Sequence, residues 1–216
     1  MRDLALTFLH EKAIEGAGDL IVTENMRLRL GLLAALPVLN LDMDWYEGWY
    51  AVILYPGAFV PNRVEMDRAG VVRPANRALS GEAWSRGPVI LSWEDVETAG
   101  RRQGHNVVVH ELAHKLDLLN GAANGFPPLH AGMSAAEWSN VFADAYEDFR
   151  VRVRDAGTLS IDAYGARSPG EFFAVLSEVF FEDPTVLVSQ YPKVYRQLES
   201  FYRRSPLARE SPCEYR

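Results

Sequence analysis

The sequence predicts an α+β fold that is mainly helical and contains a small sheet. Two short runs predict the sheet: residues 49–55 read WYAVILY, and residues 88–93 read PVILSW. Runs that are rich in β-branched and aromatic residues and bounded by proline, glycine or polar breaks are typical of strands. The helices are predicted by longer stretches in which apolar residues recur at helical spacing between capping and breaking residues.

In the first half of the chain, helices precede the strands. An amphipathic pattern opens the chain, and Thr23 or Asn25 could cap a second helix that Pro37 ends. Pro56 and a following glycine stop the strand that reads WYAVILY. The expected elements are helices over residues 4–14 and 25–36 and strands over residues 49–55, 70–73 and 88–93.

In the second half, turn and capping residues bound further helices. Asn120 and Gly121 close one helix, Ser134 begins the next with a capping-box spacing to Glu137, and Pro184 stops a third. The expected helices cover residues 103–119, 134–155, 168–182 and 192–204, after a short capped turn over residues 92–98.

Composition bounds the class of protein. The chain has 216 residues, of which 48% are hydrophobic and 24% charged, so it can bury one sizeable core and a single domain is expected. The net charge of −7 argues against nucleic acid or an anionic membrane as a partner. A lone cysteine, Cys213, suits a reducing compartment. With no secretory signal in view, and with an apolar stretch over residues 28–41 that is too broken to span a membrane, we expect a cytoplasmic enzyme.

One motif carries the chemistry. Residues 107–117 read VVVHELAHKLD and place His110, Glu111 and His114 in the order HExxH. On a helix, positions four apart lie on the same face, so the two imidazoles can bind one ion beside a carboxylate. That arrangement is what a hydrolytic zinc site needs. A shuffled chain of this composition would contain the pattern roughly 0.01 times, so chance is a weak alternative.

The third ligand has to come from elsewhere. The extended pattern HExxHxxGxxH fails, because Asp117 and Asn120 stand at the positions that glycine and histidine would occupy. Glu171 and Glu178 are seven residues apart in the apolar run GEFFAVLSEVFF, where a carboxylate is costly unless it is paired or bound to metal. Glu171 has the alternative of a capping box with Ser168, and Glu178 that of a buried hydrogen-bond partner. Spacing alone does not choose between them.

Four long segments resemble the Mlc titration factor A family of bacterial zinc peptidases. They read HELAHKLDLLNG, GEAWSRGPVILSWEDV, DWYEGWYAVILYP and SPGEFFAVLSEVFFEDP, and the resemblance covers about residues 9–207. It implies a zincin-like metallopeptidase domain similar to the protease domain of anthrax lethal factor, with a small mixed sheet beside the HExxH helix. It also implies one zinc-peptidase domain over residues 1–216. Family members usually carry a further N-terminal stretch, so we expect a truncated N-terminal segment.

The resemblance also implies which residues form the site. Zn²⁺ would be held by His110, His114 and Glu171, which leaves Glu178 behind the ligands. A tyrosine seven residues before the glutamate completes the family's site and corresponds to Tyr164 in IDAYGARSPGE. In the expected mechanism, Glu111 is the general base and Tyr164 hydrogen-bonds the oxyanion. The alternative for Tyr164 is a core tyrosine at a turn.

Other polar residues have less certain tasks. Asp117, one turn after His114, could orient a ligand imidazole or form a surface salt bridge. His105 and His130 are not at ligand spacing; His130 could line the cleft, but an ordinary loop histidine is the better expectation. The aromatic residues at positions 45, 46, 49 and 50 are expected in the core.

The substrate groove and the biological task complete the expectations. Zinc peptidases of this kind commonly bind a peptide as an added strand along a sheet edge, and the strand over residues 89–93 is the expected edge because Gly87 and Pro88 precede it. The alternative is a buried central strand, and the sequence does not choose between the two. The resemblance implies a peptidase, aminopeptidase in type, that acts on a peptide or protein. The resemblance equally allows a second class, a regulatory protein that binds the Mlc repressor of glucose-uptake genes. A third class is a scaffold protein that binds no metal. The oligomeric state is open.

Overall fold

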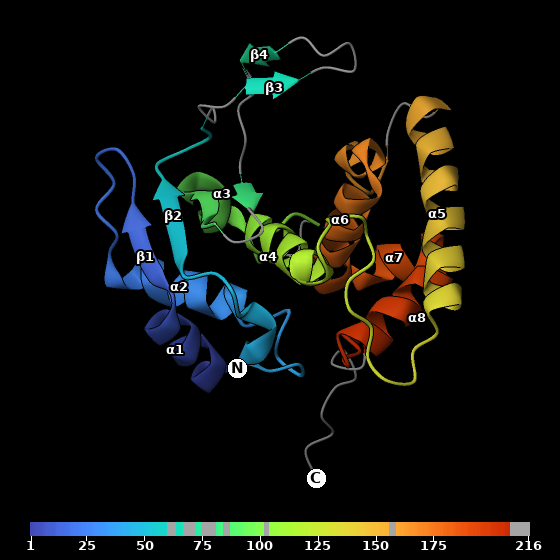
Figure 1. Ribbon diagram of the computed structural model, residues 1–216, viewed down its shortest axis with the longest axis horizontal. Coiled ribbons are helices and arrows are strands. Elements are labelled where there is room, and N and C mark those ends of the chain that lie inside the picture. Colours follow the sequence, from blue (N-terminus) through green and yellow to red (C-terminus); the bar gives the residue numbers. More distant parts are fainter. Residues whose placement is uncertain are drawn as a thin grey trace.

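A mixed sheet and a group of helices form two halves of the molecule, with helix α4 (Val107–Asp117) between them (Figure 1). The computed structural model describes residues 1–59, 64–66, 72–74, 81–83, 87–101, 104–155 and 159–207. The prediction of a mainly helical α+β fold with a small mixed sheet beside the HExxH helix is confirmed.

The sheet has four strands in the order β1-β2-β6-β5. The first three are parallel, and β5 runs antiparallel to β6. Burial alternates along β2, where Val52 and Leu54 face the core. The strands are β1 (Ala13–Gly16), β2 (Ala51–Tyr55), β5 (Gly81–Ala83) and β6 (Val89–Ser92), and a separate antiparallel pair consists of β3 (Val64–Met66) and β4 (Val72–Pro74).

The expectation that the strand around Val89 lies at the sheet edge is wrong. β6 pairs with β2 on one side and with β5 on the other, so the edge strands of this sheet are β5 and, at the far end, β1. Gly87 and Pro88 precede the first strand residue, Val89, so the proline lies outside the hydrogen-bonded ladder and does not mark an edge. The short strand predicted over residues 70–73 corresponds to β4, with residues 70 and 71 outside the described part of the chain.

The opening helix is shorter than its amphipathic pattern predicts. It ends at Glu11, and Ile14 belongs to the first strand of the sheet. Lys12 separates the two elements, because its buried ammonium group donates to the backbone oxygens of Tyr46 (2.7 Å) and Trp49 (2.9 Å). The helices of this half are α1 (Arg2–Glu11), α2 (Glu24–Ala34), capped by Thr23, and α3 (Trp93–Thr98), capped by Ser92, together with the 3-10 turn η1 (Met43–Tyr46).

The helices of the other half follow the predicted boundaries closely. One helix was not expected: Pro184 ends the helix before it and also begins a new one, since proline is well suited to the first helical turn. The elements are α5 (Ala135–Asp155), α6 (Pro169–Glu182), α7 (Pro184–Gln190) and α8 (Pro192–Phe201), with the 3-10 turns η2 (Leu118–Asn120) and η3 (Ala163–Arg167). None of the helices in the described ranges combines the length and apolar character needed to span a bilayer.

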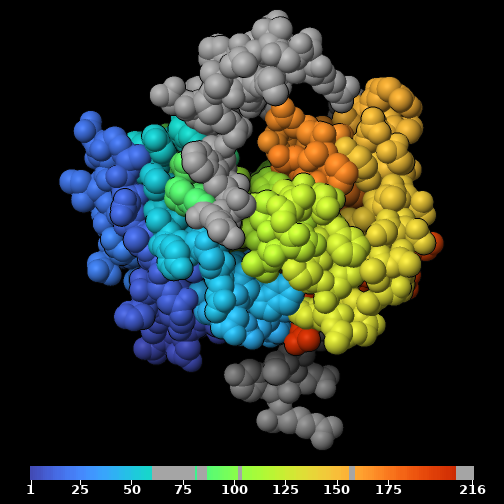
Figure 2. Space-filling view, viewed as in Figure 1, coloured from blue at the N-terminus to red at the C-terminus, as the bar shows by residue number. Residues whose placement is uncertain are grey.

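One hydrophobic core joins both halves. α4 packs against α6 on one side and against α2, β5 and β6 on the other, so it is the central element (Figure 1). The expected aromatic core residues are only partly right: Tyr46 and Trp49 are buried, whereas Tyr50 is 75% exposed. Figure 2 shows the yellow-green segment after α4 lying at the surface between the two halves.

Leu54 tests the contribution of the sheet to stability. It is fully buried in β2, opposite Gly16 of β1 and Leu91 of β6. We expect Leu54→Ala to lower the free energy of unfolding by about 2–5 kcal/mol, because it removes buried methyl groups and leaves a cavity. Leu6→Ala, at a side chain that is 48% exposed, should change it by less than about 0.5 kcal/mol. Urea unfolding measures both, and equal effects would contradict this account of the core.

Candidate metal centre

The HExxH residues lie on α4, whose start is fixed by Asn106. The Asn106 side chain accepts a hydrogen bond from the backbone N–H of Val109 (3.1 Å), so the helix begins at Val107, four residues after the predicted start at position 103, which lies outside the described residues. His110 and His114 are one turn apart, and their rings lie 4.9 Å from each other. The prediction that both imidazoles face the same side is therefore confirmed.

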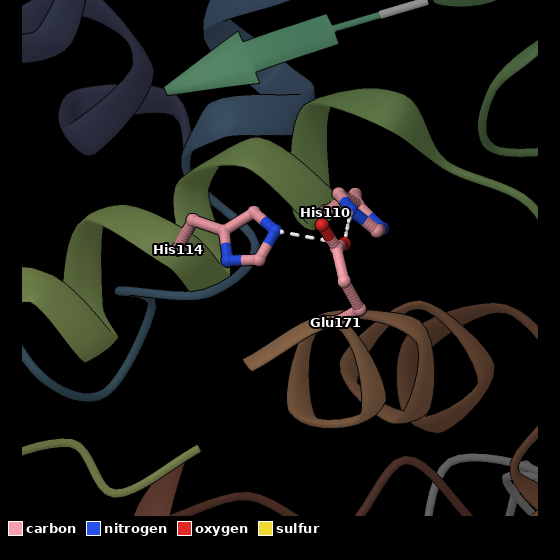
Figure 3. A group of neighbouring side chains, drawn as sticks. All are labelled: His110, His114 and Glu171. Carbon is pink, nitrogen blue, oxygen red and sulfur yellow. Dashed lines mark hydrogen bonds and ion pairs between the residues drawn. The ribbon is translucent and has the colours of Figure 1, made fainter. Parts of the chain in front are cut away.

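Glu171 comes from the first turn of α6. Ser168 caps this helix, with its hydroxyl accepting from the backbone N–H of Glu171 at 3.1 Å. The carboxylate does not turn back toward Ser168; it points toward the two imidazoles of α4 (Figure 3). Only half of the expected capping box is therefore formed: Ser168 caps the helix, but the Glu171 side chain does not take part in the cap.

Three ligand atoms from these residues converge. One carboxylate oxygen of Glu171, Oε2, lies 3.1 Å from His110 Nε2 and 3.2 Å from His114 Nε2 (Figure 3). The ligand atoms all lie within 4.8 Å of one another. Within the described part of the chain this is the one group of three or more His, Cys, Asp or Glu residues with such spacing.

Glu178 lies behind the cluster. Its Oε1 atom is 2.6 Å from His110 Nδ1, and its Oε2 atom accepts from the backbone N–H of Asn106 at 2.6 Å. The alternative that Glu178 is a buried hydrogen-bond partner is therefore confirmed. Because Nδ1 of His110 faces a carboxylate, Nε2 is left as the free nitrogen that points at Glu171. His114 lacks such support, since its Nδ1 atom is buried with no hydrogen-bond partner among the described residues.

These short contacts shift the pKa values of the cluster in opposite directions. Burial would lower the pKa of His110, but its hydrogen bonds to Glu171 and Glu178 raise it well above the usual value. Burial would raise the pKa of Glu171, but hydrogen bonds from His110 and His114 hold it far below the usual range. These contacts therefore favour a protonated His110 and an ionised Glu171.

Glu111 adjoins the cluster without bonding to it. Burial raises the pKa of its carboxyl group, the two histidines lower it, and the charges of Glu171 and Glu178 raise it again, so that the net shift is upward. The edge strand approaches it closely: a Cβ atom at Gly81 of β5 would lie 2.6 Å from Cγ of Glu111. A carboxylate with a raised pKa is a better proton acceptor than an exposed one.

Tyr164 is brought to the same place by η3. Its ring is half-buried, and its centre lies 6.0 Å from the centre of the His110 ring. The guanidinium of Arg167 lies 5.0 Å from the centre of the tyrosine ring. Burial and the charge of Glu171 raise the pKa of Tyr164, Arg167 lowers it, and the net direction is upward, so the phenol keeps its proton.

Three residues considered from the sequence lie outside the cluster. Both expectations for Asp117 are wrong: it is fully buried, and its oxygens accept the backbone N–H groups of Gly125 and Phe126 instead of an imidazole or a surface cation. Burial raises its pKa to about 6, against the lowering effect of those N–H groups. His130 binds the backbone oxygen of Phe201 at 2.8 Å and is a structural loop residue, as expected. His105 is exposed and lies 3.9 Å from Asp162, away from the ligand atoms.

Sequence reasoning missed several residues that build the site. Asn106 directly precedes an apolar run, so its cap could have been predicted, but its link to Glu178 and Glu182 across 72 and 76 residues could not. Arg167 gave no signal beyond its nearness to Tyr164. The sequence did not indicate a role for Gly81, because β5 has only three residues and lacks the alternation of apolar and polar residues that predicts a strand.

The donor set suits a metal ion of the zinc type. Two imidazole nitrogens and one carboxylate oxygen point at a common position, and a carboxylate fixes the far nitrogen of one imidazole. Three nitrogen and oxygen ligands of this kind are typical of catalytic zinc sites in proteins. The residues therefore fit a metal centre.

Comparison with known proteins assigns the class. The model of the glucose-regulated metallo-peptidase M90 family matches residues 1–203, so the chain belongs to this family of metallopeptidases. It is 39% identical over 209 residues to the Mlc titration factor A of Yersinia enterocolitica, which covers 95% of this chain and 78% of that protein. The Mlc titration factors A of Yersinia pestis and Yersinia pseudotuberculosis are similar to the same degree, with 77% of each covered. The resemblance inferred from the sequence motifs is confirmed.

Proposed function

We propose that this chain is a zinc-dependent peptidase, aminopeptidase in type, that acts in the cytoplasm. The observation that carries the proposal is the convergence of His110 Nε2, His114 Nε2 and Glu171 Oε2 in a chain that belongs to a metallopeptidase family. We assign these three side chains as the ligands of Zn²⁺. A bound zinc ion would polarise the scissile carbonyl and make a water molecule acidic enough to attack it near neutral pH.

Glu111 is the general base in this proposal. It is buried beside the ligands and next to the edge strand, and its raised pKa favours acceptance of a proton. It would take the proton of the attacking water and then pass it to the nitrogen of the leaving amine. Both transfers need one carboxylate that is held close to the reacting carbonyl, and its place on the ligand helix supports this task.

Tyr164 is the partner of the developing oxyanion. Its ring lies beside His110, and its raised pKa keeps the hydroxyl protonated and able to donate. The protonated hydroxyl would donate to the carbonyl oxygen as negative charge develops there.

The edge strand β5 is the proposed wall of the substrate groove. Among the described strands it pairs on one side only, and its first residue, Gly81, lies against Glu111. A peptide that adds to the open side of β5 would pass the proposed base, and its main-chain groups would find partners along the strand. The lack of a side chain at Gly81 lets the strand come this close.

A regulatory task is the second candidate function. The matched relatives are named Mlc titration factor A, and this name favours an interaction with the Mlc repressor, and so a part in the control of glucose uptake. In this alternative the chain is a repressor-binding protein whose peptidase activity is secondary or latent. The two tasks can coexist, and they are separable because proton transfer by Glu111 is needed for only one of them.

Glu111→Gln separates the two functions. The amide keeps the size of the side chain but cannot accept the proton, so we expect kcat to fall by about 10²- to 10⁴-fold with zinc content and repressor binding unchanged. Rates should be measured on a peptide with a free amino terminus and on its N-acetylated counterpart, since an aminopeptidase cleaves only the first. Glu147→Gln, at an exposed position of α5, is the matched control. A Glu111→Gln protein that cleaves as fast as the parent would show that the base is another residue.

The choice of third ligand is tested by two alanine variants. We expect Glu171→Ala to remove most of the bound zinc, because it deletes a ligand. Glu178→Ala should weaken binding by only about 10- to 100-fold, because it deletes the support of His110. Zinc per chain, measured by elemental analysis after dialysis at a fixed free zinc concentration, distinguishes them. The reverse order would overturn the ligand assignment.

Activity should depend on pH through the histidines. Because hydrogen bonds to Glu171 and Glu178 raise the pKa of His110, a proton competes with metal for this nitrogen at a higher pH than for a free imidazole. Lowering the pH therefore favours the protonated, metal-free site, and we expect zinc content and kcat/KM to fall together below roughly pH 6. A profile that stays flat down to about pH 5 would contradict a histidine-bound metal as the catalyst.

A further inference from the structure

Asp117 and the loop that follows α4 connect the histidine helix to the start of α6. We propose that Asp117 is a positioning residue of the metal centre: through residues 121–126 it fixes where α6 begins, and so where the Glu171 carboxylate lies relative to His110 and His114. The inference rests on the proposed function, in which Glu171 is the third ligand.

The Asp117 carboxylate holds the loop at one end. It lies one turn after His114 on α4 and is fully buried. Its Oδ2 atom accepts from the backbone N–H of Gly125 at 2.7 Å, and its Oδ1 atom accepts from that of Phe126 at 2.9 Å. Hydrogen bonds from two neighbouring N–H groups to an ionised carboxylate are short and strong, so the loop is tied to the same helix that carries both histidines.

The loop contacts the first turn of α6 directly through backbone atoms, at positions where glycine has no side chain. A Cβ atom at Gly125 would lie 2.6 Å from the carbonyl oxygen of Pro169, and one at Gly170 would lie 2.6 Å from that of Ala123. Gly125 also has a φ of +77°, which favours glycine. With no side chain between them, the loop and the residues next to Glu171 cannot shift independently.

A second helix holds the same loop from the outside. The indole N–H of Trp138, which is fully buried in α5, donates to the backbone oxygen of Gly125 at 2.9 Å. Gly125 therefore has its N–H bound by α4, its oxygen bound by α5 and its Cα against α6. In Figure 2 the yellow-green surface of this segment adjoins the orange surface of α6, in agreement with these contacts.

A metal site tolerates little displacement of a ligand. Metal–ligand distances in proteins are held to within about 0.2 Å, and a misplacement of about 0.5 Å already spoils such a site. Glu171 is the only one of the three proposed ligands that is not on α4, so its place depends on how α6 begins relative to that helix. Asp117 sets this relation through the loop.

Two substitutions address the two ends of this connection. Asp117→Asn keeps one acceptor oxygen but turns an NH₂ group toward the other backbone N–H. Gly170→Ala places a methyl group against the carbonyl of Ala123, although alanine is the better helix former. Asp183→Asn is the matched control, because Asp183 also accepts a backbone N–H, from Val186 at 3.4 Å, but at the end of α6 away from Glu171. Glu171→Ala is the reference for loss of a ligand.

The readouts are the Kd for Zn²⁺ by chelator competition, the visible absorption of the Co²⁺-loaded protein, and the Tm of the metal-free protein. We expect Asp117→Asn and Gly170→Ala to raise the Kd by about 10- to 100-fold and to change the Co²⁺ spectrum, which reports the ligand geometry. Asp183→Asn should lower only the Tm. If the metal-free Asp117→Asn protein is unfolded, Gly170→Ala decides.

Each outcome bears on a different claim. A Kd and a Co²⁺ spectrum like those of the parent in Asp117→Asn and Gly170→Ala, with or without a lower Tm, would overturn the positioning role and leave the ligand assignment intact. A parental Kd in Glu171→Ala would instead refute Glu171 as a ligand and, with it, the proposed function on which the inference rests.

Discussion

The packing of α4 against α6 is the contact on which the rest of the molecule depends. It brings several ionisable side chains together beside an aromatic and aliphatic core, among them His110, Glu171 and Glu178. Isolated charges there would be costly, and the structure lowers the cost by placing a carboxylate oxygen within hydrogen-bond distance of three of the four imidazole nitrogens of His110 and His114. The same contacts direct nitrogen and oxygen atoms toward one point. The arrangement that makes burial of these groups less costly therefore also provides a possible set of metal ligands.

The two histidines are held in different ways. His110 is fixed from behind by Glu178, which is itself anchored to the backbone of Asn106 at the start of α4. His114 has no such partner in the described residues, and its position follows from the helix alone. Among the proposed ligands, His110 is thus the one whose ring is already oriented, because a carboxylate faces its Nδ1 atom. His114 is oriented mainly by the packing of its helix.

In the proposed function, the sheet contributes through its edge strand β5. β6 is paired on both sides, whereas β5 pairs only with β6 among the described strands, and its first residue, Gly81, lies against Glu111. A short edge strand limits unwanted pairing with other chains, while one glycine in it allows the backbone to approach the proposed base. Both the place where chemistry would occur and the place where a peptide would lie are therefore set by elements that contact the same helix.

The sequence by itself determined the local features: the HExxH face of α4, the caps at Thr23 and Ser168, and the family, because periodicity, capping and motifs depend on neighbouring residues. Spacing alone could not rank Glu171 above Glu178, since both lie on the same face of α6. The resemblance ranked them, and the tertiary contacts place Glu171 beside both imidazoles and Glu178 behind His110. Only the tertiary structure decided that β5, and not β6, is the edge strand next to Glu111 and that Asp117 holds a loop against α6. These features depend on contacts between residues far apart in the chain, or on contacts between two backbone segments. No side-chain pattern in the sequence indicates which residues form such contacts.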